Sequence, residues 1–284
     1  MSYLTFYHDP IDLTIRKRSS CRTYNDMLLA SEDKEQLCRF WTNVFSGLNK
    51  ESMQYHLVEY DRAFLKGKKL AGYGLFKNPR TSIVGVIEKS DTCCISFGYL
   101  MEHVVLKATE IGLGTCWLGD FDPYVTQDIA VTQKQIIPAV CLVGYAAEQP
   151  TLKEKLARFA IRASRRRPWS QLFFDGSFST PLVEDKAGHY AEPLELLRLA
   201  PSARNAQPWK VVKEYGKNVF HFYKQIMIPR CEKKKLHDID LGIAMCHFEL
   251  GCAKNKLNGH WQMTGPQFKD IPANTHYILT WMDQ

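Results

Sequence analysis

The chain has 284 residues, 45% of them hydrophobic, and a formal net charge of +7 at pH 7. That length and apolar content suffice for one extended core or two smaller ones, so we expect a globular protein. The positive excess is modest for so long a chain. It argues against a nucleic-acid-binding protein and suits a smaller anionic ligand such as a phosphate.

The N-terminal sequence MSYLTFYHDP lacks the basic region and the apolar run of a signal peptide. The longest nearly apolar stretch, residues 136–147, is too short to span a bilayer. Nine cysteines without a CxxC pair suit neither a disulfide framework nor a zinc site. We therefore expect a cytoplasmic protein that binds no membrane and no metal, with reduced and mostly buried cysteines.

The predicted elements of the first half begin with a helix from Ser31, a candidate N-cap, to about residue 45. Strands are predicted at 54–60, 70–76 and 81–87. A long helix follows, and then a further strand at 135–145.

In the second half, a helix is predicted at 190–199, followed by a hairpin of strands 209–214 and 219–224. A second long helix comes next, and a strand at 276–281 closes the chain. Both halves have the order helix, strands, long helix, strand, which predicts an α+β fold.

The two long helices belong to an internal repeat. Residues 97–117 and 241–261 align without a gap at an offset of 144 residues, and six of the 21 aligned positions are identical. Chance alone would give roughly one identity. The offset is about half of the chain, which indicates a duplication. His103 and His247 are among the identical pairs, and without ligand partners at metal spacing we expect them to be structural.

The most basic segment, residues 152–169, lies between the two copies. We place the domain boundary there, which gives a first half of residues 1–168 and a second half of 169–284. This segment ends with Arg165, Arg166 and Arg167. Three consecutive arginines rarely serve only to join domains, although by themselves they are more typical of a charged linker face or a weak nucleic-acid patch than of a ligand site.

A second basic cluster lies in IRKRSSCRTY, residues 15–24, where Arg18 and Arg22 bracket Ser19 and Ser20. Arginine gives bidentate charge-assisted bonds and serine a short neutral donor, so the combination suits a phosphate dianion. The alternatives are a solvated basic arm and a phosphorylation target.

The glycine-rich stretch IGLGTCWLGDFD, residues 111–122, follows a helix and lacks the GxGxxG spacing, so it is not a dinucleotide fingerprint. It predicts a tight turn in which the backbone N–H groups of Leu118 and Gly119 point at a ligand atom. An ordinary helix C-terminus is the alternative.

The stretch APSARNAQPW, residues 200–209, places several polar side chains around two prolines. Pro201 starts a turn, and Ser202 and Asn205 either cap local backbone or face a ligand. Asn205 and Gln207 each carry a donor and an acceptor on one planar head, which matches a planar heterocycle. A simple connection between a helix and a strand is the alternative.

Together these segments resemble the nitroreductase family of FMN-dependent oxidoreductases, in the branch where one chain holds two nitroreductase-like halves. APSARNAQPW is similar to the PSxxNxQPW signature of that family, and the Arg18-Ser20-Arg22 pattern, GLGTCWLGDFD and RRRPW are similar to its other segments. The resemblance implies the nitroreductase fold, with two tandem pseudo-symmetric halves that mimic the homodimer of the family. FMN would lie between the halves, and NADH or NADPH would be the electron donor.

The resemblance also implies which residues contact FMN. The first half would supply contacts to the phosphate and ribityl chain and backbone donors near flavin N5, and the second half would supply the contacts that a partner subunit makes elsewhere. The implied residues are Arg18, Ser19, Ser20, Arg22, Leu118, Gly119, Arg165 and Arg167 from the first half, and Pro201, Ser202, Asn205 and Gln207 from the second.

Two departures from the family pattern predict one FMN per chain. The first half has no second PSxxNxQPW, since residues 43–53 read NVFSGLNKESM, and the second half has no late basic segment. We therefore expect a monomer that acts as a pseudo-dimer. Arg204 stands where small or polar residues are common in the family, so it either reaches the phosphate or lies at the surface.

The implied activity is the reduction of a nitroaromatic, quinone or similar electron-poor small molecule by NAD(P)H, with ping-pong kinetics and no catalytic acid or base. A specialised flavin reaction such as dehalogenation is an alternative within the family. A non-enzymatic FMN-binding or redox-sensing protein is an alternative of another class. The residues do not distinguish between nitroaromatic and quinone substrates or between NADH and NADPH.

Overall fold

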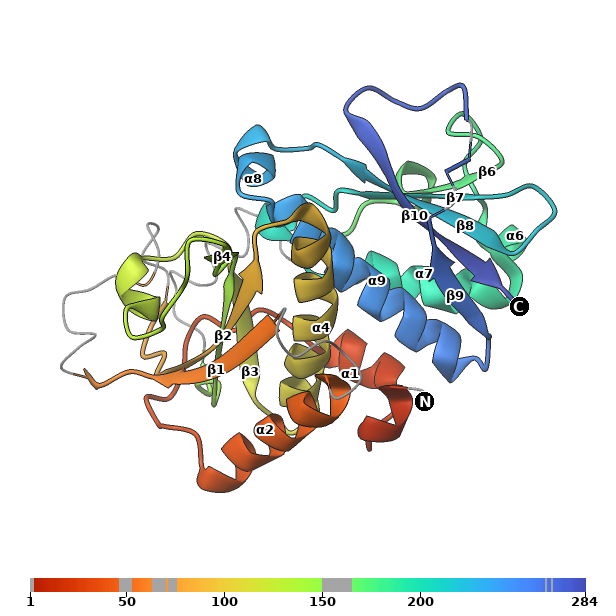
Figure 1. Ribbon diagram of the computed structural model, residues 1–284. Coiled ribbons are helices and arrows are strands. Elements are labelled where there is room, and N and C mark those ends of the chain that lie inside the picture. Colours follow the sequence, from red (N-terminus) through yellow and green to blue (C-terminus); the bar gives the residue numbers. More distant parts are fainter. Residues whose placement is uncertain are drawn as a thin grey trace.

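The computed structural model describes residues 3–45, 53–62, 70, 76–149, 165–263, 265–266 and 268–284. Two β-sheets lie on opposite sides of a central pair of helices, α4 (Asp91–Glu110) and α9 (Leu236–Lys254), as Figure 1 shows. Both helices are apolar around most of their circumference, and 13 of the 20 residues of α4 and 16 of the 19 residues of α9 are buried. Such helices form the core of a domain rather than its surface. None of the described helices is long and apolar enough to cross a bilayer.

The first sheet is antiparallel, with the strand order β1-β2-β5-β3, and β4 pairs with β2. Its central strand β2 reads TSIVGVIE and is buried on both faces, which explains its run of β-branched residues. The strands are β1 (Met53–Glu59), β2 (Thr81–Glu88), β3 (Gly114–Leu118), β4 (Gln135–Ile136) and β5 (Val140–Gly144).

The second sheet has the order β6-β7-β8-β10-β9. Its β7-β8-β10-β9 part repeats the order of the first sheet, and β6 adds a strand parallel to β7. The strands are β6 (Phe173–Asp175), β7 (Trp209–Lys213), β8 (Val219–Gln225), β9 (Gly259–Gln262) and β10 (Thr275–Asp283).

Shorter helices cover the central pair. In α2, Leu37, Phe40 and Val44 recur on one face, and this buried face packs toward α4. The other helices are α1 (Ile11–Lys17), α2 (Ser31–Phe45), α6 (Glu184–Ala187), α7 (Ala191–Arg198) and α8 (Pro229–Lys233), with short 3-10 helices at η1 (Tyr3–Phe6), η2 (Pro123–Thr126), η3 (Trp169–Gln171), η4 (Gly188–Tyr190) and η5 (Ala203–Asn205).

The two central helices meet through a reciprocal pair of glycines. A Cβ atom on Gly98 of α4 would collide with the carbonyl oxygen of Ile239, and one on Gly242 of α9 would collide with that of Ile95. Each contact is related to the other by the 144-residue offset of the repeat. Glycine is required here because only its hydrogen leaves room for the backbones to approach this closely.

Most elements predicted from the sequence are confirmed. The structure contains α2, β1, β2, α7, the β7–β8 hairpin, both long helices and the final strand. Residues 71–75 of the strand predicted at 70–76 lie outside the described residues, as does most of the basic segment 152–169. The predicted duplication and the boundary after residue 168 remain predictions.

Three predictions of local structure were wrong or incomplete. The strand predicted at 135–145 is divided into β4 and β5, with Pro138 between them, because proline has no N–H to donate to a ladder. The stretch predicted as a tight turn at Leu118 forms β3 instead, which pairs with β5. Helix α1 was missed, since its seven residues are too few for a clear helical period.

Candidate functional site

A hollow open to solvent, with about 350 Å³ of empty space that includes part of that solvent, lies between the first sheet, the 200–209 stretch and α9. One wall comes from the end of β3 and the residues after it, a second from the start of the 200–209 stretch, and a third from α9. The lining residues are Trp117, Gly119, Ala139, Pro201, Ser202, Ala203, Leu236, Ile239, Asp240 and Ile243. Gly119, Pro201 and Ser202, which the sequence predicted to share one site, therefore lie together.

Gly119 belongs to the hollow, whereas Leu118 belongs to the sheet. Leu118 is fully buried opposite Val140 in the β3–β5 ladder. A Cβ atom on Gly119 would lie 2.6 Å from a methyl group of Leu236 on α9. A larger residue at 119 would therefore require the Leu236 side chain to shift, which would change the shape of the hollow.

The 200–209 stretch, called the signature loop below, adopts an uncommon backbone. Arg204, Asn205 and Gln207 have φ values of 53°, 55° and 51°, in the left-handed region that non-glycine residues rarely occupy. Each such residue stores on the order of 1 kcal/mol of strain, so the surrounding contacts must hold it. Backbone bonds supply part of that hold, because Ala203 N donates to Asp240 Oδ1 over 2.7 Å and Gln207 N donates to Ser202 Oγ over 2.9 Å.

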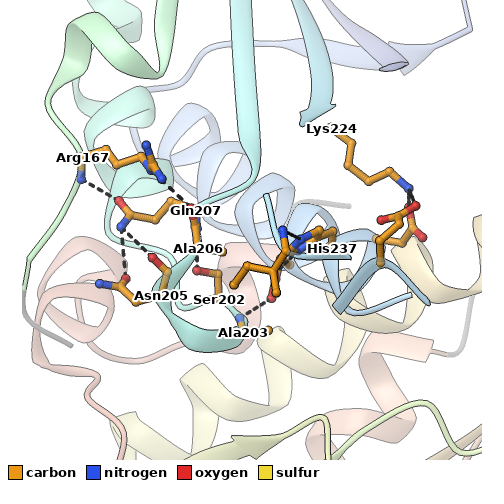
Figure 2. A network of polar contacts seen from close by, with 12 residues as sticks. Arg167, Ser202, Ala203, Asn205, Ala206, Gln207, Lys224 and His237 are labelled. Atoms are coloured by element: carbon orange, nitrogen blue, oxygen red, sulfur yellow. Dashed lines mark hydrogen bonds and ion pairs between the residues drawn. The ribbon is translucent and has the colours of Figure 1, made fainter. Parts of the chain in front are cut away.

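The amide heads of the signature loop bond to the arginine segment, residues 165–167, and Figure 2 shows the bond between Gln207 and Arg167. Arg167 N donates to Gln207 Oε1 over 2.7 Å, and Asn205 Nδ2 donates to the Arg165 carbonyl over 2.8 Å. Gln207 also donates to the Asn205 backbone carbonyl over 3.2 Å, and its exposed fraction is 3%. The two amides that the sequence assigned to a ligand thus hold the loop against the arginines, and their contacts with FMN stay a prediction.

Arg166 is the residue that sequence reasoning missed. The sequence analysis paired Arg165 with Arg167, but Arg165 is exposed while Arg166 is half-buried. Arg166 donates to Asn205 Oδ1 over 3.2 Å and to the Leu199 carbonyl over 2.9 Å. Alternation along the chain does not separate Arg166 from both neighbours, since Arg167 is also half-buried and donates to the Ala206 carbonyl over 3.3 Å.

Two arginines from distant parts of the sequence come together beside this loop. Arg18 is buried, and its Nε lies 4.0 Å from Glu102 Oε1. Burial, together with the positive charges of Arg18 and Arg198, lowers the pKa of Arg166 to about 10. Arg198 is itself paired with Glu195 over 2.6 Å. The mutual repulsion of Arg18 and Arg166 makes the space near them favourable for an anion.

The segment after Arg18 runs beside β3. Cys21 N donates to the Thr115 carbonyl over 2.8 Å, and Ser20 forms a parallel bridge with Thr115. Ser20 is half-buried and Arg22 is buried, whereas Ser19 is exposed. Of the two serines predicted to contact the phosphate, Ser20 therefore has the more enclosed environment.

Buried Glu102 links three elements around the site. Its Oε1 lies 2.9 Å from His247 Nε2 on α9, and its Oε2 accepts from the indole N–H of Trp117 over 2.8 Å. Trp117 lines the hollow and Arg18 lies on the other side of the carboxylate. The neighbouring His103 is also fully buried, and burial followed by the charge of His247 lowers the pKa of His103 to about 3.

A second carboxylate–histidine pair supports the wall formed by α9. Asp240 Oδ2 lies 3.3 Å from His237 Nδ1, and His237 Nε2 accepts from Ile228 N over 3.2 Å. That acceptor role assigns the ring proton to Nδ1, which donates to Asp240. Burial raises the pKa of Asp240. Lys224, in Figure 2, bonds Asp238 over 2.6 Å nearby. No three His, Cys, Asp or Glu residues within the described ranges are arranged to hold a metal ion.

The family model described as "Putative TM nitroreductase" matches residues 11–252. A solved structure from Thermotoga maritima, described as a "putative nitroreductase", is 18% identical to the chain, with 97% of this chain and 94% of that chain covered and a TM-score of 0.60. This similarity shows a shared fold over nearly the whole length. No curated protein sequence matches the chain.

Two smaller solved structures cover about half of the chain. A nitroreductase with bound FMN from Desulfitobacterium hafniense is 17% identical, covers 51% of this chain and 93% of its own, and has a TM-score of 0.40. A nitroreductase with bound FMN from Bacteroides fragilis is 20% identical, with 51% and 92% covered and a TM-score of 0.39.

Proposed function

The chain belongs to the nitroreductase family, whose model matches residues 11–252, and we propose that it is an FMN-dependent oxidoreductase. It would pass electrons from NADH or NADPH to a nitroaromatic, a quinone or a similar electron-poor small molecule. The observation that carries this proposal is the hollow walled by Gly119, Pro201 and Ser202. Those residues come from the two segments that the resemblance assigns to opposite sides of one flavin.

The residues beside the hollow fit the phosphate of FMN. Arg18 is more than nine-tenths buried, and its Nε has no hydrogen-bond partner among the described residues. Arg166 approaches it closely enough for the two charges to repel each other. A buried cation needs a counter-charge, and Glu102 is shared with His247. A phosphate dianion would supply the missing negative charge.

When bound, FMN supplies a ring system that accepts and returns a hydride equivalent. Arg18, Ser20 and Arg22 would hold the phosphate end, joined by Arg166. Gly119 and the backbone before Arg204 would border the ring.

Other residues of the sequence prediction would act through their neighbours. Asn205, Gln207 and the backbone of Arg165 and Arg167 would keep the signature loop in place through their bonds, of which Figure 2 draws the one between Arg167 and Gln207. Ser19 and Leu118 would position their neighbours along the chain. No side chain is assigned as a catalytic acid or base, because solvent can deliver protons to nitro and quinone acceptors.

We further propose one flavin per chain, between halves of residues 1–168 and 169–284 that arose by duplication. The repeated strand order and the reciprocal contacts of Gly98 and Gly242 support this origin. A monomer then suffices. Since a single hollow serves both substrates, donor and acceptor would occupy it in turn, which gives ping-pong kinetics.

Absorbance spectroscopy of the purified protein tests the proposal. We expect an FMN spectrum at about one flavin per chain, and bleaching when NADH or NADPH is added without oxygen. Oxidised spectra should return on addition of a nitroaromatic or quinone. Protein that gains no flavin absorbance on incubation with FMN contradicts the proposal, and flavin that neither nicotinamide reduces indicates a binding or sensing protein.

A further inference from the structure

A cluster of basic side chains, called the basic rim here, adjoins the residues that line the hollow: Arg204, Arg230 and Lys234. Arg230 Nη2 lies 3.0 Å from Asp120 Oδ2, and Lys234 Nζ lies 2.6 Å from Asp120 Oδ1. Arg204 and Asp120 directly follow residues that line the hollow in the sequence. Asp120 follows Gly119 and Arg204 follows Ala203, and both Gly119 and Ala203 line the hollow.

Arg204 belongs to this cluster although it comes from the signature loop. The pKa of Asp120 is lowered by the hydrogen bond from Lys234, and the charges of Lys234, Arg230 and Arg204 lower it further. All three cations thus act on one carboxylate. Three positive charges against one negative charge leave the rim with a net positive charge.

Of the three cations, Arg204 is the one without a structural role in the described contacts of the cluster. Arg230 and Lys234 tie α8 and the residue after it to the segment that follows β3, which is a sufficient structural role. By contrast, Arg204 is exposed, and no hydrogen bond or ion pair joins its side chain to another described residue. Its backbone is left-handed, with φ 53°, a conformation that asparagine or glycine adopts at lower cost than arginine.

We propose that the basic rim binds an anionic group, a carboxylate or a phosphate, of the substrate that enters the hollow. This inference rests on the proposed function, since it concerns the substrate of the same site. The guanidinium of Arg204 would bond the anion, and Arg230 and Lys234 would add long-range attraction. The anion comes either from the electron acceptor or from the dinucleotide donor, and the experiment separates these sources.

The experiment compares matched substrates in three variants of the full-length, FMN-loaded protein. Acceptors are 4-nitrobenzoate and the neutral 4-nitrobenzyl alcohol, and donors are NADPH and NADH, which differ by one phosphate. Arg204→Asn removes the charge with a residue that tolerates the left-handed backbone. Arg204→Lys keeps the charge as the control, and Asp120→Asn raises the net charge of the rim.

With Arg204→Asn we expect kcat/KM for one anionic substrate to fall about fivefold, whereas its neutral or less charged counterpart changes less than about twofold, as an exposed charged contact predicts. Arg204→Lys should restore most of the loss. Asp120→Asn should shift the ratio in the opposite direction, so an Arg204 variant that folds poorly does not remove the test. Loss confined to 4-nitrobenzoate assigns the anion to the acceptor, and loss confined to NADPH assigns it to the donor.

Equal changes in kcat/KM for charged and neutral substrates in both Arg204→Asn and Asp120→Asn would overturn the proposal that the basic rim binds an anion. The proposed flavin activity would still stand. An unsubstituted protein that binds FMN but reduces no acceptor with either donor would overturn the proposed function, and the rim with it. The flavin content of each variant, read from its absorbance, distinguishes these results from simple loss of the cofactor.

Discussion

Arg166 Nη1 donates to Asn205 Oδ1 over 3.2 Å, and this bond joins the arginine segment to the signature loop. The same guanidinium donates to the Leu199 carbonyl just before the loop. Arg166 therefore bonds the loop and the residue before it, while the charge of Arg18 acts on its guanidinium. The proposed phosphate end and the proposed ring side of the site consequently share one side chain.

Replacement of Arg166 should weaken FMN binding more than replacement of its neighbour. We expect Arg166→Met to raise the Kd for FMN by about 10- to 100-fold, because charge-assisted bonds of this kind contribute roughly 1.5–3 kcal/mol. Arg165→Met, at an exposed position, should change it less than about threefold. Fluorescence titration with FMN and with riboflavin measures both. Equal losses for riboflavin would show that Arg166 acts on the loop alone.

Residues from both proposed halves of the chain should contribute to the affinity for FMN. Arg18→Ala and Asn205→Ala are each expected to weaken FMN binding at least about tenfold, since one removes a buried cation and the other releases the signature loop. Ser19→Ala is the matched control, because Ser19 is exposed. If titration detects an effect from only one of the two substitutions, the shared site is refuted.

The close approach of α4 and α9 should not tolerate a methyl group. Gly98→Ala or Gly242→Ala places Cβ against a backbone carbonyl, which cannot move without shifting a helix. We expect either change to lower the free energy of unfolding by at least about 2 kcal/mol, although alanine favours helix. Gly265→Ala, whose Cβ would lie 3.8 Å from Tyr277, should stay within about 0.5 kcal/mol. Urea denaturation gives these values.

The buried His103 predicts loss of stability in acid. Its pKa is lowered to about 3, so it stays neutral in the folded protein while the unfolded chain takes up a proton below about pH 6.5. The unfolded state then binds more protons, and stability falls as the pH decreases between these values. The contribution of His103 is about 2 kcal/mol from pH 7 to pH 5.

His103→Asn tests this, because asparagine does not titrate. The substitution is expected to reduce the slope of unfolding free energy against pH by about 1.2 kcal/mol per pH unit between pH 4 and 6, whatever its effect on stability at pH 7. Denaturation at several pH values gives the slope. An unchanged slope would mean that His103 is protonated in the folded protein.

Sequence patterns predicted the regular elements well, because the signals for helices and hairpins lie in residues that are close together in the chain. The repeated helices and the β7–β8 hairpin depend on apolar periodicity and on turn residues such as Gly216, and both are present. Short strands of a few residues were harder to predict from the sequence. The pairing of residues 114–118 with β5 depends on a partner strand more than 20 residues away, which the glycine-rich stretch itself does not reveal.

The site could be predicted as a set of segments but not as a set of contacts. Gly119, Pro201 and Ser202 share the hollow, as the resemblance implied. The orientation of side chains depends on backbone angles that sequence patterns do not determine. The left-handed residues at 205 and 207 turn their amides toward the arginine segment, and burial separates Arg166 from Arg165.

The backbone conformation of the signature loop has a kinetic consequence. Bonds from Ala203 N and Gln207 N already hold the segment that contains its three left-handed residues, so the loss of chain entropy that their geometry demands occurs during folding. A ligand arriving at the hollow then meets a preorganised wall. Association should accordingly be a single step limited by diffusion and charge, with no slower phase from rearrangement of the loop.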